Sequence, residues 1–322
     1  MTSLSSAPRT GLAHVAYRLG ERAAARGLDW PLVELRDPAA LEAVIEDLEV
    51  LVISGLWRNE LLDRAPRLRF IQSISAGTDQ YDRERLRARG VRLASAVGVN
   101  ANAVAEHALA LLLALTRRLP EAVANQARRH WRGMLGDLAL REQELAGKTL
   151  VLVGLGRIGN RIAELARAFG MRVLAVRRDP AAGAGAASAV HALTELPELA
   201  ARADVLLLAC PLTPETEGLV GRELLARLPS GALFVNVARG RCVDEAALVA
   251  ALASGRLAGA AIDVTRDEPL PAHSALWAAP NLLLTPHTAG ETRAYEDRVL
   301  DLLVENVARL ARGEPRLVNE VV

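Results

Sequence analysis

Three polar side chains come after apolar runs that are typical of buried strands. Arg239 follows ALFVNVA, Glu268 comes shortly after GAAIDV, and His287 ends the run NLLLTPH. Open parallel sheets bind ligands beyond the carboxyl ends of their strands, so the three side chains are predicted to converge on one ligand. An arginine can bind a carboxylate and a neighbouring ketone together, and a histidine beside a glutamate can act as a general acid. These residue types are suited to act together at the reactive end of a cofactor.

Each of these residues also has a plainer interpretation. Glu268 in an Asp-Glu-Pro turn is by itself a surface acid, and His287 by itself is a capped histidine at the end of a strand. Only their joint placement, each just past a predicted strand, favours chemistry.

A glycine turn precedes these residues in the chain. Gly154-x-Gly156-x-x-Gly159 follows the apolar run TLVLV and opens a segment with Ile158, Ile162, Leu165 and Phe169 on one helical face. The first glycine permits a tight turn, the second lets a pyrophosphate approach the backbone, and the third lets the helix lie close to the strand. The turn predicts a dinucleotide site at the helix N-terminus; the alternative is a packing turn without a ligand.

The second strand of this unit ends on Arg177 and Arg178, where an acid that binds the ribose is often found. A guanidinium there pairs with the 2′-phosphate of NADP, so NADP is favoured over NAD. Asp179 falls within the expected spacing, but Pro180 follows it, which favours turn chemistry for that aspartate. The alternative is that both arginines are solvated surface charges.

The apolar runs predict an α/β fold. Short runs bounded by turn residues alternate with helical patterns, which is typical of parallel sheets covered by helices on both faces. With 322 residues, of which 51% are hydrophobic, two domains are expected. The predicted strands lie within 48–55, 67–75, 149–154, 171–176, 204–210, 232–238, 259–264 and 281–287.

Composition excludes several classes of function. The formal charge is +1, far from the basic excess of nucleic-acid-binding proteins, so no nucleic-acid partner is expected. No segment resembles a signal peptide or a membrane span, and a cytoplasmic location is predicted. Cys210 and Cys242 have no metal-ligand spacing and predict neither a disulfide framework nor a metal site.

The order GLGRIG, CPLTPET, NVARGRCVDE, DVTRDEPLP and TPHTAG resembles the D-isomer-specific 2-hydroxyacid dehydrogenase family over nearly the whole chain. The resemblance implies two Rossmann- or flavodoxin-like domains with the active site in the cleft between them. It places a flavodoxin-like substrate-binding domain at 1–100 plus 288–322, and a dinucleotide-binding Rossmann domain at 101–287. It also implies a homodimer through the apolar helix region 101–118.

The resemblance also implies roles for residues. Arg239 would orient the substrate and polarise its carbonyl, His287 would be the general acid, and Glu268 would raise the pKa of that histidine. In SAGTDQYD, the backbone N–H groups of Ala76, Gly77 and Thr78 would bind the substrate carboxylate. The predicted cofactor site comprises Gly154, Gly156, Arg157, Ile158, Gly159, Arg177, Arg178, Cys210, Pro211, Val237, Ala238, Asp263, Ala289 and Gly290. Within it, Asp263 would bind the nicotinamide carboxamide.

A small 2-oxo or 2-hydroxy acid of D configuration is the substrate class that this resemblance implies, with glyoxylate or hydroxypyruvate reduction favoured. Formate oxidation is disfavoured because Glu268 stands where formate dehydrogenases have glutamine. Two alternatives remain: a phosphoglycerate dehydrogenase-like enzyme, from which extra basic residues and often a regulatory extension are expected, and a dinucleotide-sensing corepressor-like protein without turnover.

Two local features have open interpretations. Trp57 and Arg58 follow the strand run VLVIS and either reach the substrate or pack on the domain surface, the second being favoured. Thr265 stands where the family commonly has an aromatic residue, so packing near the carboxamide is expected to differ.

Overall fold

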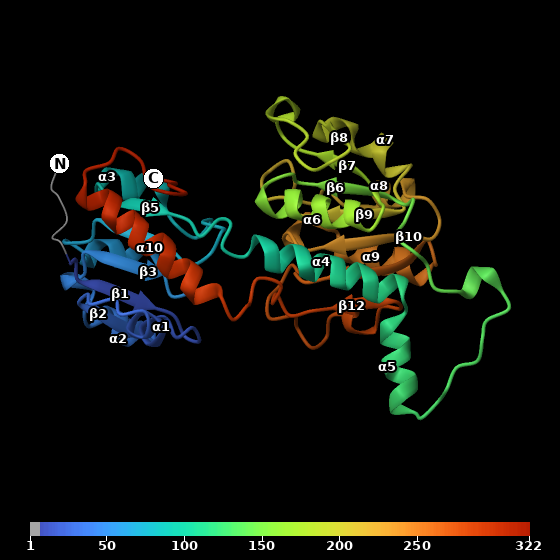
Figure 1. The fold of residues 1–322 in the computed structure, drawn as a ribbon, viewed down its shortest axis with the longest axis horizontal. Coiled ribbons are helices and arrows are strands. Elements are labelled where there is room, and N and C mark those ends of the chain that lie inside the picture. The colour runs from blue at the N-terminus through green and yellow to red at the C-terminus, as the bar shows by residue number, and fades with distance from the viewer. Residues whose placement is uncertain (1–6) are drawn as a thin grey trace. The chain divides into compact units, whose positions relative to one another are not determined.

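The chain forms two compact α/β units. The structure is a computed structural model that describes residues 7–322. The first unit contains the described residues up to Asn100 together with Thr292–Val322, and the second contains Ala101–Glu291 (Figure 1). The chain therefore leaves the first unit once and returns to it once.

The return occurs after Glu291, four residues later than the predicted boundary between 287 and 288. The reason is a buried carboxylate. Asp263 accepts hydrogen bonds from the backbone N–H groups of Thr288 and Ala289, each at 3.0 Å, which ties the residues just past His287 to the second unit.

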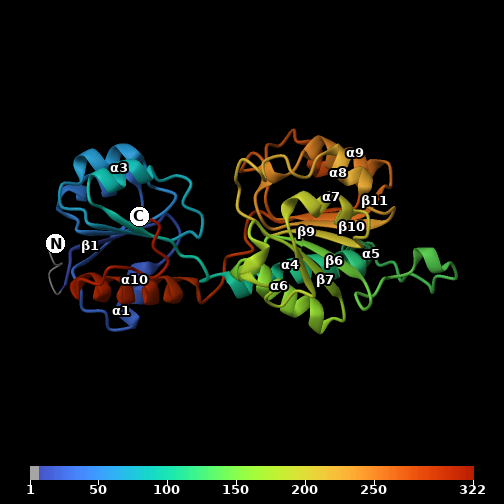
Figure 2. The same cartoon turned by 90° about the horizontal axis from the view of Figure 1, so that it is seen from above.

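The first unit has a five-stranded sheet in the order β2-β1-β3-β4-β5, and every pair is parallel. Its strands are β1 (Thr10–Ala13), β2 (Leu32–Leu35), β3 (Val50–Ile53), β4 (Phe70–Ser73) and β5 (Arg92–Ala94). Its helices are α1 (Leu19–Ala25), α2 (Pro38–Glu42), α3 (Arg83–Ala88) and α10 (Tyr295–Ala311). Side chains of α1 and α10 share one apolar core with the sheet, and those of α2 and α3 share the other, so helices cover both faces (Figure 2).

The second unit has a seven-stranded parallel sheet in the order β12-β11-β10-β9-β6-β7-β8. Its strands are β6 (Thr149–Val153), β7 (Arg172–Val176), β8 (Ala189–His191), β9 (Val205–Leu208), β10 (Ala232–Asn236), β11 (Leu257–Ile262) and β12 (Leu282–Leu284). Its helices are α4 (Ala101–Thr116), α5 (Leu119–Ala127), α6 (Arg157–Ala168), α7 (Leu196–Ala200), α8 (Arg222–Arg227) and α9 (Glu245–Ala253). Helices α4 and α6 cover one face, and α7, α8 and α9 cover the other (Figure 2).

The predicted α/β class with parallel sheets is confirmed, and each of the eight apolar runs overlaps a strand. Four further strands, β1, β2, β5 and β8, were not predicted. They have three or four residues each, and β8 is half-buried along its length, so their sequences lack the long apolar run of a central strand.

The strand order of the second unit reverses between β6 and β9. The chain runs outward from β6 to β7 and β8, and then returns to place β9 on the other side of β6. Ligands of open α/β sheets bind beyond the carboxyl ends of the strands at such a switch point. Gly154 follows β6 and Cys210 comes just after β9, so both lie at this edge.

An extended segment, here called the arm (residues 117–146), follows α4. It contains α5 and a long irregular stretch that runs away from the sheet of the second unit before β6 begins (Figure 1). Helix α4 itself packs on α6, β10 and β11. Most of its apolar residues are therefore buried or half-buried within the second unit, and Ala110 is exposed.

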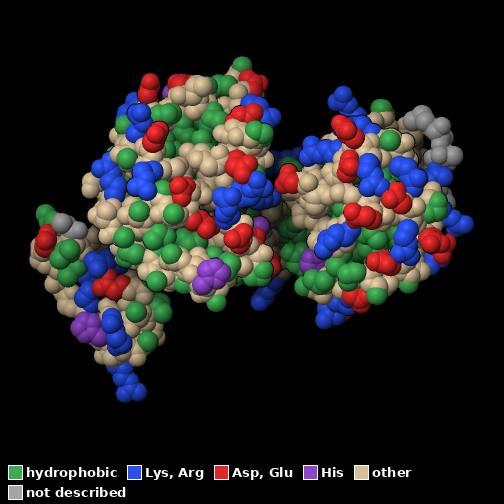
Figure 3. Space-filling view, turned by 180° about the vertical axis from the view of Figure 1, so that it is seen from behind, with side chains coloured by type: hydrophobic (Ala, Val, Ile, Leu, Met, Phe, Trp, Pro, Cys, Tyr) green, Lys and Arg blue, Asp and Glu red, His purple; other side chains and the backbone are tan. Residues whose placement is uncertain are grey.

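The described surface carries charges of both signs. Lysine and arginine side chains are interspersed with aspartate and glutamate over the face seen in Figure 3. Among residues 7–322, no helix has both the length and the apolar character needed to span a membrane. No group of three metal-ligating side chains in that part of the chain has the arrangement of a metal site.

Candidate active site

The ends of three adjacent strands carry the predicted catalytic residues. Strands β10, β11 and β12 are neighbours in the sheet, and Arg239, Glu268 and His287 follow them in that order. Glu268 and His287 meet directly, because Nδ1 of His287 lies 2.7 Å from Oε2 of Glu268. The other carboxylate oxygen of Glu268 accepts from the backbone N–H of Thr265 at 3.0 Å. The glutamate is thereby held against the histidine.

This contact sets the protonation of both groups. The hydrogen bond that His287 donates to Glu268 raises the pKa of His287 above its ordinary value, although partial burial and the Arg239 guanidinium oppose the rise. Burial alone would raise the pKa of Glu268, but its bonds to His287 and to the Thr265 N–H outweigh that effect and lower it. The pair therefore favours a protonated imidazole beside an ionised carboxylate, which is the state of a general acid.

The turn that carries Arg239 is fixed by its own polar contacts and by close packing. The amide of Asn236 accepts from the N–H of Ala238 at 2.9 Å and donates to the carbonyl of Arg239 at 3.1 Å. A Cβ on Gly240 would lie 1.9 Å from the carbonyl carbon of Thr265, so only glycine fits there. The loop after β10 therefore rests directly on the loop that holds Glu268.

Asp263 is a buried carboxylate with a larger set of partners than the sequence indicates. Its side chain is 2% exposed, and Oδ1 accepts from the Thr285 hydroxyl at 2.6 Å. Thr285 in turn lies 3.0 Å from Nε2 of His107, on α4. Burial alone would raise the pKa of Asp263, but hydrogen bonds from His107, Thr285 and the N–H groups of Ala289 and Thr288 lower it. The predicted bond from Asp263 to the nicotinamide carboxamide stays a prediction.

Sequence reasoning missed the roles of Thr285 and His107. Thr285 occurs in the same TPH motif as His287, and His107 lies in the apolar helix region 101–118, for which the sequence indicates only an interface. The two residues are 178 positions apart, and their contact depends on the packing of α4 against the sheet. Spacing along the chain carries no signal for it.

The glycine turn has the geometry of an anion site. Gly154 has φ +101°, and a Cβ on Gly159 would lie 2.0 Å from the Gly154 carbonyl oxygen, which enforces close strand-to-helix packing. A Cβ on Gly156 would have no packing partner within 4 Å among the described residues, so the outer side of this glycine is open. Gly156 is also the N-cap of α6, and no side chain caps that helix. The N-terminal N–H groups of the helix and the positive end of its dipole fit a dinucleotide pyrophosphate.

The end of β7 carries the predicted ribose contact. The strand ends at Val176, and the Arg177 guanidinium donates to the carbonyl of Gly183 at 3.0 Å. Arg178 is exposed. Asp179 accepts from the N–H of Ala181 at 3.0 Å and caps a short 3-10 turn, which confirms the predicted turn chemistry.

The remaining predicted cofactor residues lie along the same edge of the sheet. Cys210 with Pro211 follows β9, and Val237 with Ala238 follows β10. Exposure varies among them: Cys210, Val237, Ala238 and Ala289 are buried, Ile158 and Gly290 are half-buried, and Arg157 and Pro211 are exposed. Their roles toward a cofactor stay predictions.

The predicted carboxylate loop lies in the first unit, after β4. Within residues 7–322, the backbone N–H groups of Ala76, Gly77 and Thr78 donate to no acceptor. The side chain of Thr78 is buried and accepts from the Arg83 guanidinium at 3.0 Å. Three free donors beside a cation fit an anionic group.

Trp57 packs in the core of the first unit, rather than on the domain surface as the favoured interpretation had it. It is 2% exposed, and its ring lies against that of Tyr81 with centroids 5.6 Å apart. The neighbouring Arg58 is exposed and donates to the carbonyl oxygens of Gly55 and Trp57 at 3.1 and 2.7 Å. Trp57 is thus a structural residue.

Comparison with known proteins gives consistent results. Residues 109–289 match the model of the D-isomer specific 2-hydroxyacid dehydrogenase, NAD binding domain. A glyoxylate reductase of Aeropyrum pernix is 38% identical over 82% of this chain and 80% of its own. A solved NADPH-dependent glyoxylate/hydroxypyruvate reductase of Sinorhizobium meliloti, in complex with NADP and malonate, has a TM-score of 0.81 at 32% identity over 98% of this chain and 97% of its own.

Longer relatives match as well. A D-3-phosphoglycerate dehydrogenase of Mycobacterium tuberculosis is 36% identical over 94% of this chain but only 56% of its own length, so the chain spans about half of that relative. The family model covers more than half of the chain, and the matched relatives extend over nearly all of it. The chain belongs to the D-isomer-specific 2-hydroxyacid dehydrogenase family.

Proposed function

We propose that the protein reduces a small 2-oxo acid to the corresponding D-2-hydroxy acid with a nicotinamide cofactor. The observation that carries this proposal is the 2.7 Å contact between Glu268 and Nδ1 of His287. Because Nδ1 faces the glutamate, Nε2 is the nitrogen left to donate a proton to the forming alkoxide. A positioned acid of this kind contributes about 10² to 10⁴-fold in rate.

The other residues act on the substrate. Arg239 binds the substrate carboxylate and carbonyl oxygen, and stabilises the negative charge that develops on that oxygen. The free N–H groups of residues 76–78 bind the same carboxylate. The bound cofactor supplies the hydride, and His287 supplies the proton. That the substrate binds between the two units stays a prediction, and so does the cytoplasmic location.

A substrate panel tests this function. Purified protein is assayed for NADH and NADPH consumption with glyoxylate, hydroxypyruvate, pyruvate, longer 2-oxo acids and phosphohydroxypyruvate. We expect turnover with glyoxylate or hydroxypyruvate. Binding of the cofactor without consumption of it on any substrate would contradict the proposal and support a dinucleotide sensor.

The substrate preference rests on relatives. Relatives named glyoxylate reductase match this chain at 34 to 38% identity. The second candidate is a phosphoglycerate dehydrogenase-like activity, supported by the 36% identity to the mycobacterial relatives. Preferred turnover of phosphohydroxypyruvate in the panel would select this second candidate.

For the cofactor, we propose a preference for NADP, because Arg177 directly follows β7, where an acidic residue that binds the ribose is usual.

We expect Arg177→Asp to lower the ratio of kcat/KM with NADPH to that with NADH by about 10-fold or more, since a charge-assisted phosphate contact becomes repulsive. Steady-state kinetics with both cofactors measure this ratio. Arg172→Asp, at the exposed opposite end of the same strand, is the control. An unchanged ratio in Arg177→Asp would make this arginine a surface charge.

We further propose that the chain forms a homodimer through the arm. Nine large apolar residues are exposed in the described chain, and six lie on the arm: Leu119, Val123, Trp131, Met134, Leu138 and Leu140. Such a concentration marks an interaction surface. The region predicted from the sequence, 101–118, consists of α4 and the first two residues of the arm, and most apolar residues of α4 pack within the second unit, so we place the proposed interface mainly on the arm.

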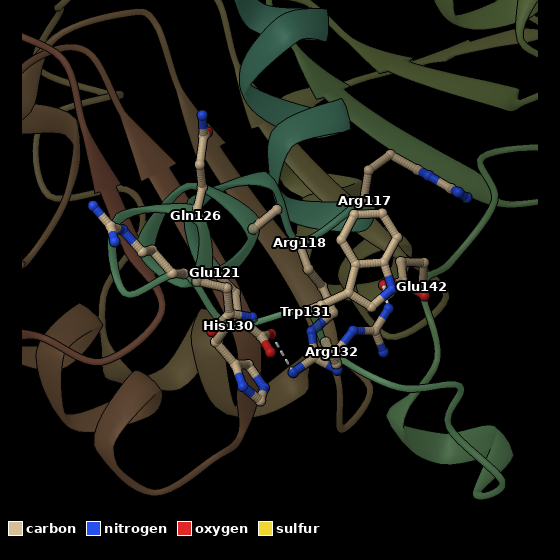
Figure 4. Close-up of a pocket in the computed structure, with 11 residues that line it drawn as sticks. Arg117, Arg118, Glu121, Gln126, His130, Trp131, Arg132 and Glu142 are labelled. Carbon is tan, nitrogen blue, oxygen red and sulfur yellow. Dashed lines mark hydrogen bonds and ion pairs between the residues drawn. The ribbon is translucent and has the colours of Figure 1, made fainter.

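The arm has an indented surface as well as apolar side chains. A pocket of about 480 Å³ is lined by side chains of α5 and of the stretch after it, including Trp131. Figure 4 shows how these side chains lie around it. The ion pair between Arg132 and Glu142, at 2.6 Å, joins two parts of this stretch. Trp131 itself is 95% exposed. A pocket and an exposed apolar side chain on the same surface can pair with the same two features on a second copy of the chain.

The dimer is tested by replacing apolar residues of the arm. We expect wild-type protein to sediment as a dimer and Trp131→Ser/Met134→Ser to sediment as a monomer, because the double variant removes apolar area from the interface. Trp277→Ser is the matched control, since Trp277 is 58% exposed but lies outside the arm. A double variant that stays dimeric in sedimentation velocity would place the interface elsewhere.

A further inference from the structure

A polar network around the buried Asp263 carboxylate connects α4 to the loop that carries His287. His107, on α4, lies 3.0 Å from the Thr285 hydroxyl through its Nε2, and 3.5 Å from Oδ1 of Asp263. Thr285 lies 2.6 Å from the same carboxylate oxygen. None of the three side chains belongs to the Glu268–His287 pair.

The donor of each hydrogen bond in this network follows from the number of protons that each group carries. The Thr285 hydroxyl has one proton and gives it to Asp263, because an ionised carboxylate only accepts. The contact with His107 must then be donated by the histidine, through Nε2–H, to a lone pair of the Thr285 oxygen. This fixes the protonated nitrogen of His107 and orders the hydroxyl toward Asp263.

Asp263 connects the network to the backbone of the loop that carries His287. Its carboxylate accepts from the N–H groups of Thr288 and Ala289, and its backbone carbonyl accepts from the N–H of His287 at 2.7 Å. His287 has φ +57°, a left-handed conformation that non-glycine residues seldom adopt. Such a conformation persists only where surrounding contacts fix it.

We propose that His107 is a positioning residue for His287: through Thr285 and Asp263 it holds the loop in the conformation that places the imidazole against Glu268. This inference rests on the proposed function for its kinetic consequence. Its structural consequence, the contact between His287 and Glu268, can be tested without turnover.

The first measurement is an NMR titration of the histidine imidazoles in the whole protein. The charged groups that act on His287 are Glu268, Asp263 and Arg239. Loss of the Glu268 contact is expected to lower the pKa of His287 toward its ordinary value. We expect this decrease in His107→Ala and in Thr285→Val, each of which interrupts the network at one point.

The second measurement is kinetic. We expect His107→Ala to lower kcat by about 10-fold or more with little change in the cofactor Kd, because a small misplacement of a catalytic group is costly. His107→Gln retains an N–H donor on a side chain of similar reach and is expected to restore most of kcat. Glu106→Gln is the matched control, because Glu106 is exposed on the same helix and contacts Asn102.

Two substitutions that interrupt the same network should not have additive effects on kcat. The double variant His107→Ala/Thr285→Val is expected to lower kcat no further than either single variant. An unchanged His287 titration in both single variants would overturn the inference, and so would additive losses in the double variant. If the wild-type protein lacks turnover, the proposed function is wrong. The NMR titration still tests whether His107 holds His287 against Glu268, because it does not depend on turnover.

Discussion

Replacement of His287 by asparagine is expected to lower kcat for 2-oxo acid reduction by about 10² to 10⁴-fold, the usual contribution of a positioned general acid. The cofactor Kd should change little, since the substitution removes only the proton donor. Steady-state kinetics and fluorescence titration with NADPH measure the two quantities. His191→Asn is the matched control, because His191 pairs with Glu195 at 2.9 Å on the surface in a similar way. Near-normal kcat in His287→Asn would contradict the mechanism.

The same residue fixes the direction of the pH dependence. Reduction needs the protonated imidazole, and the pKa of His287 is raised by Glu268. The rate is therefore expected to be maintained at low pH and to fall as the pH rises through this raised pKa. Glu268→Gln removes the carboxylate charge, so the decline should begin at lower pH. A pH profile of kcat that is identical in Glu268→Gln and wild type would show that the pair does not set the acid.

Replacement of Arg239 by alanine is expected to have a comparably large effect. The guanidinium is assigned to the developing oxyanion, and loss of one such donor typically lowers kcat by about 10² to 10³-fold. KM for the 2-oxo acid should rise as well, because the same group binds the carboxylate. Arg239→Lys should restore activity only in part, since an ammonium group lacks the two-pronged geometry.

The control for Arg239 lies two residues away. Arg241 forms an exposed ion pair with Glu217 at 2.7 Å, outside the proposed site. Arg241→Ala is expected to keep kcat and KM within about 2-fold, since exposed ion pairs contribute little. Equal losses in the two alanine variants would point to damage of the turn rather than to loss of a substrate contact.

Much of the fold was accessible from the sequence because the central strands are continuous apolar runs. Strand β9, for example, is VLLL and is buried along its length. The edge strand β8 is AVH and half-buried, and its short mixed sequence gives no comparable signal. Patterning therefore predicted the buried middle of each sheet more completely than its edges.

The site was predictable where chemistry follows a strand end and unpredictable where it depends on packing between distant elements. His287 and Glu268 each come after a recognisable run, so their proximity followed from the parallel sheet. The contact of His107 with Thr285 depends on how α4 lies on the sheet, which spacing does not encode. The exposed apolar residues of the arm were likewise missed, because composition does not report which side chains a fold leaves uncovered.

The strand order of the second unit separates the arginine proposed to select the cofactor from the arginine proposed to bind the substrate. Arg177 follows β7 and Arg239 follows β10, and β6 and β9 lie between these strands. Three strand spacings amount to roughly 14 Å. Substitutions at such a distance with no shared partner usually have additive free energies. Cofactor selectivity and substrate range should therefore be open to independent redesign, with each property altered at its own end of the sheet.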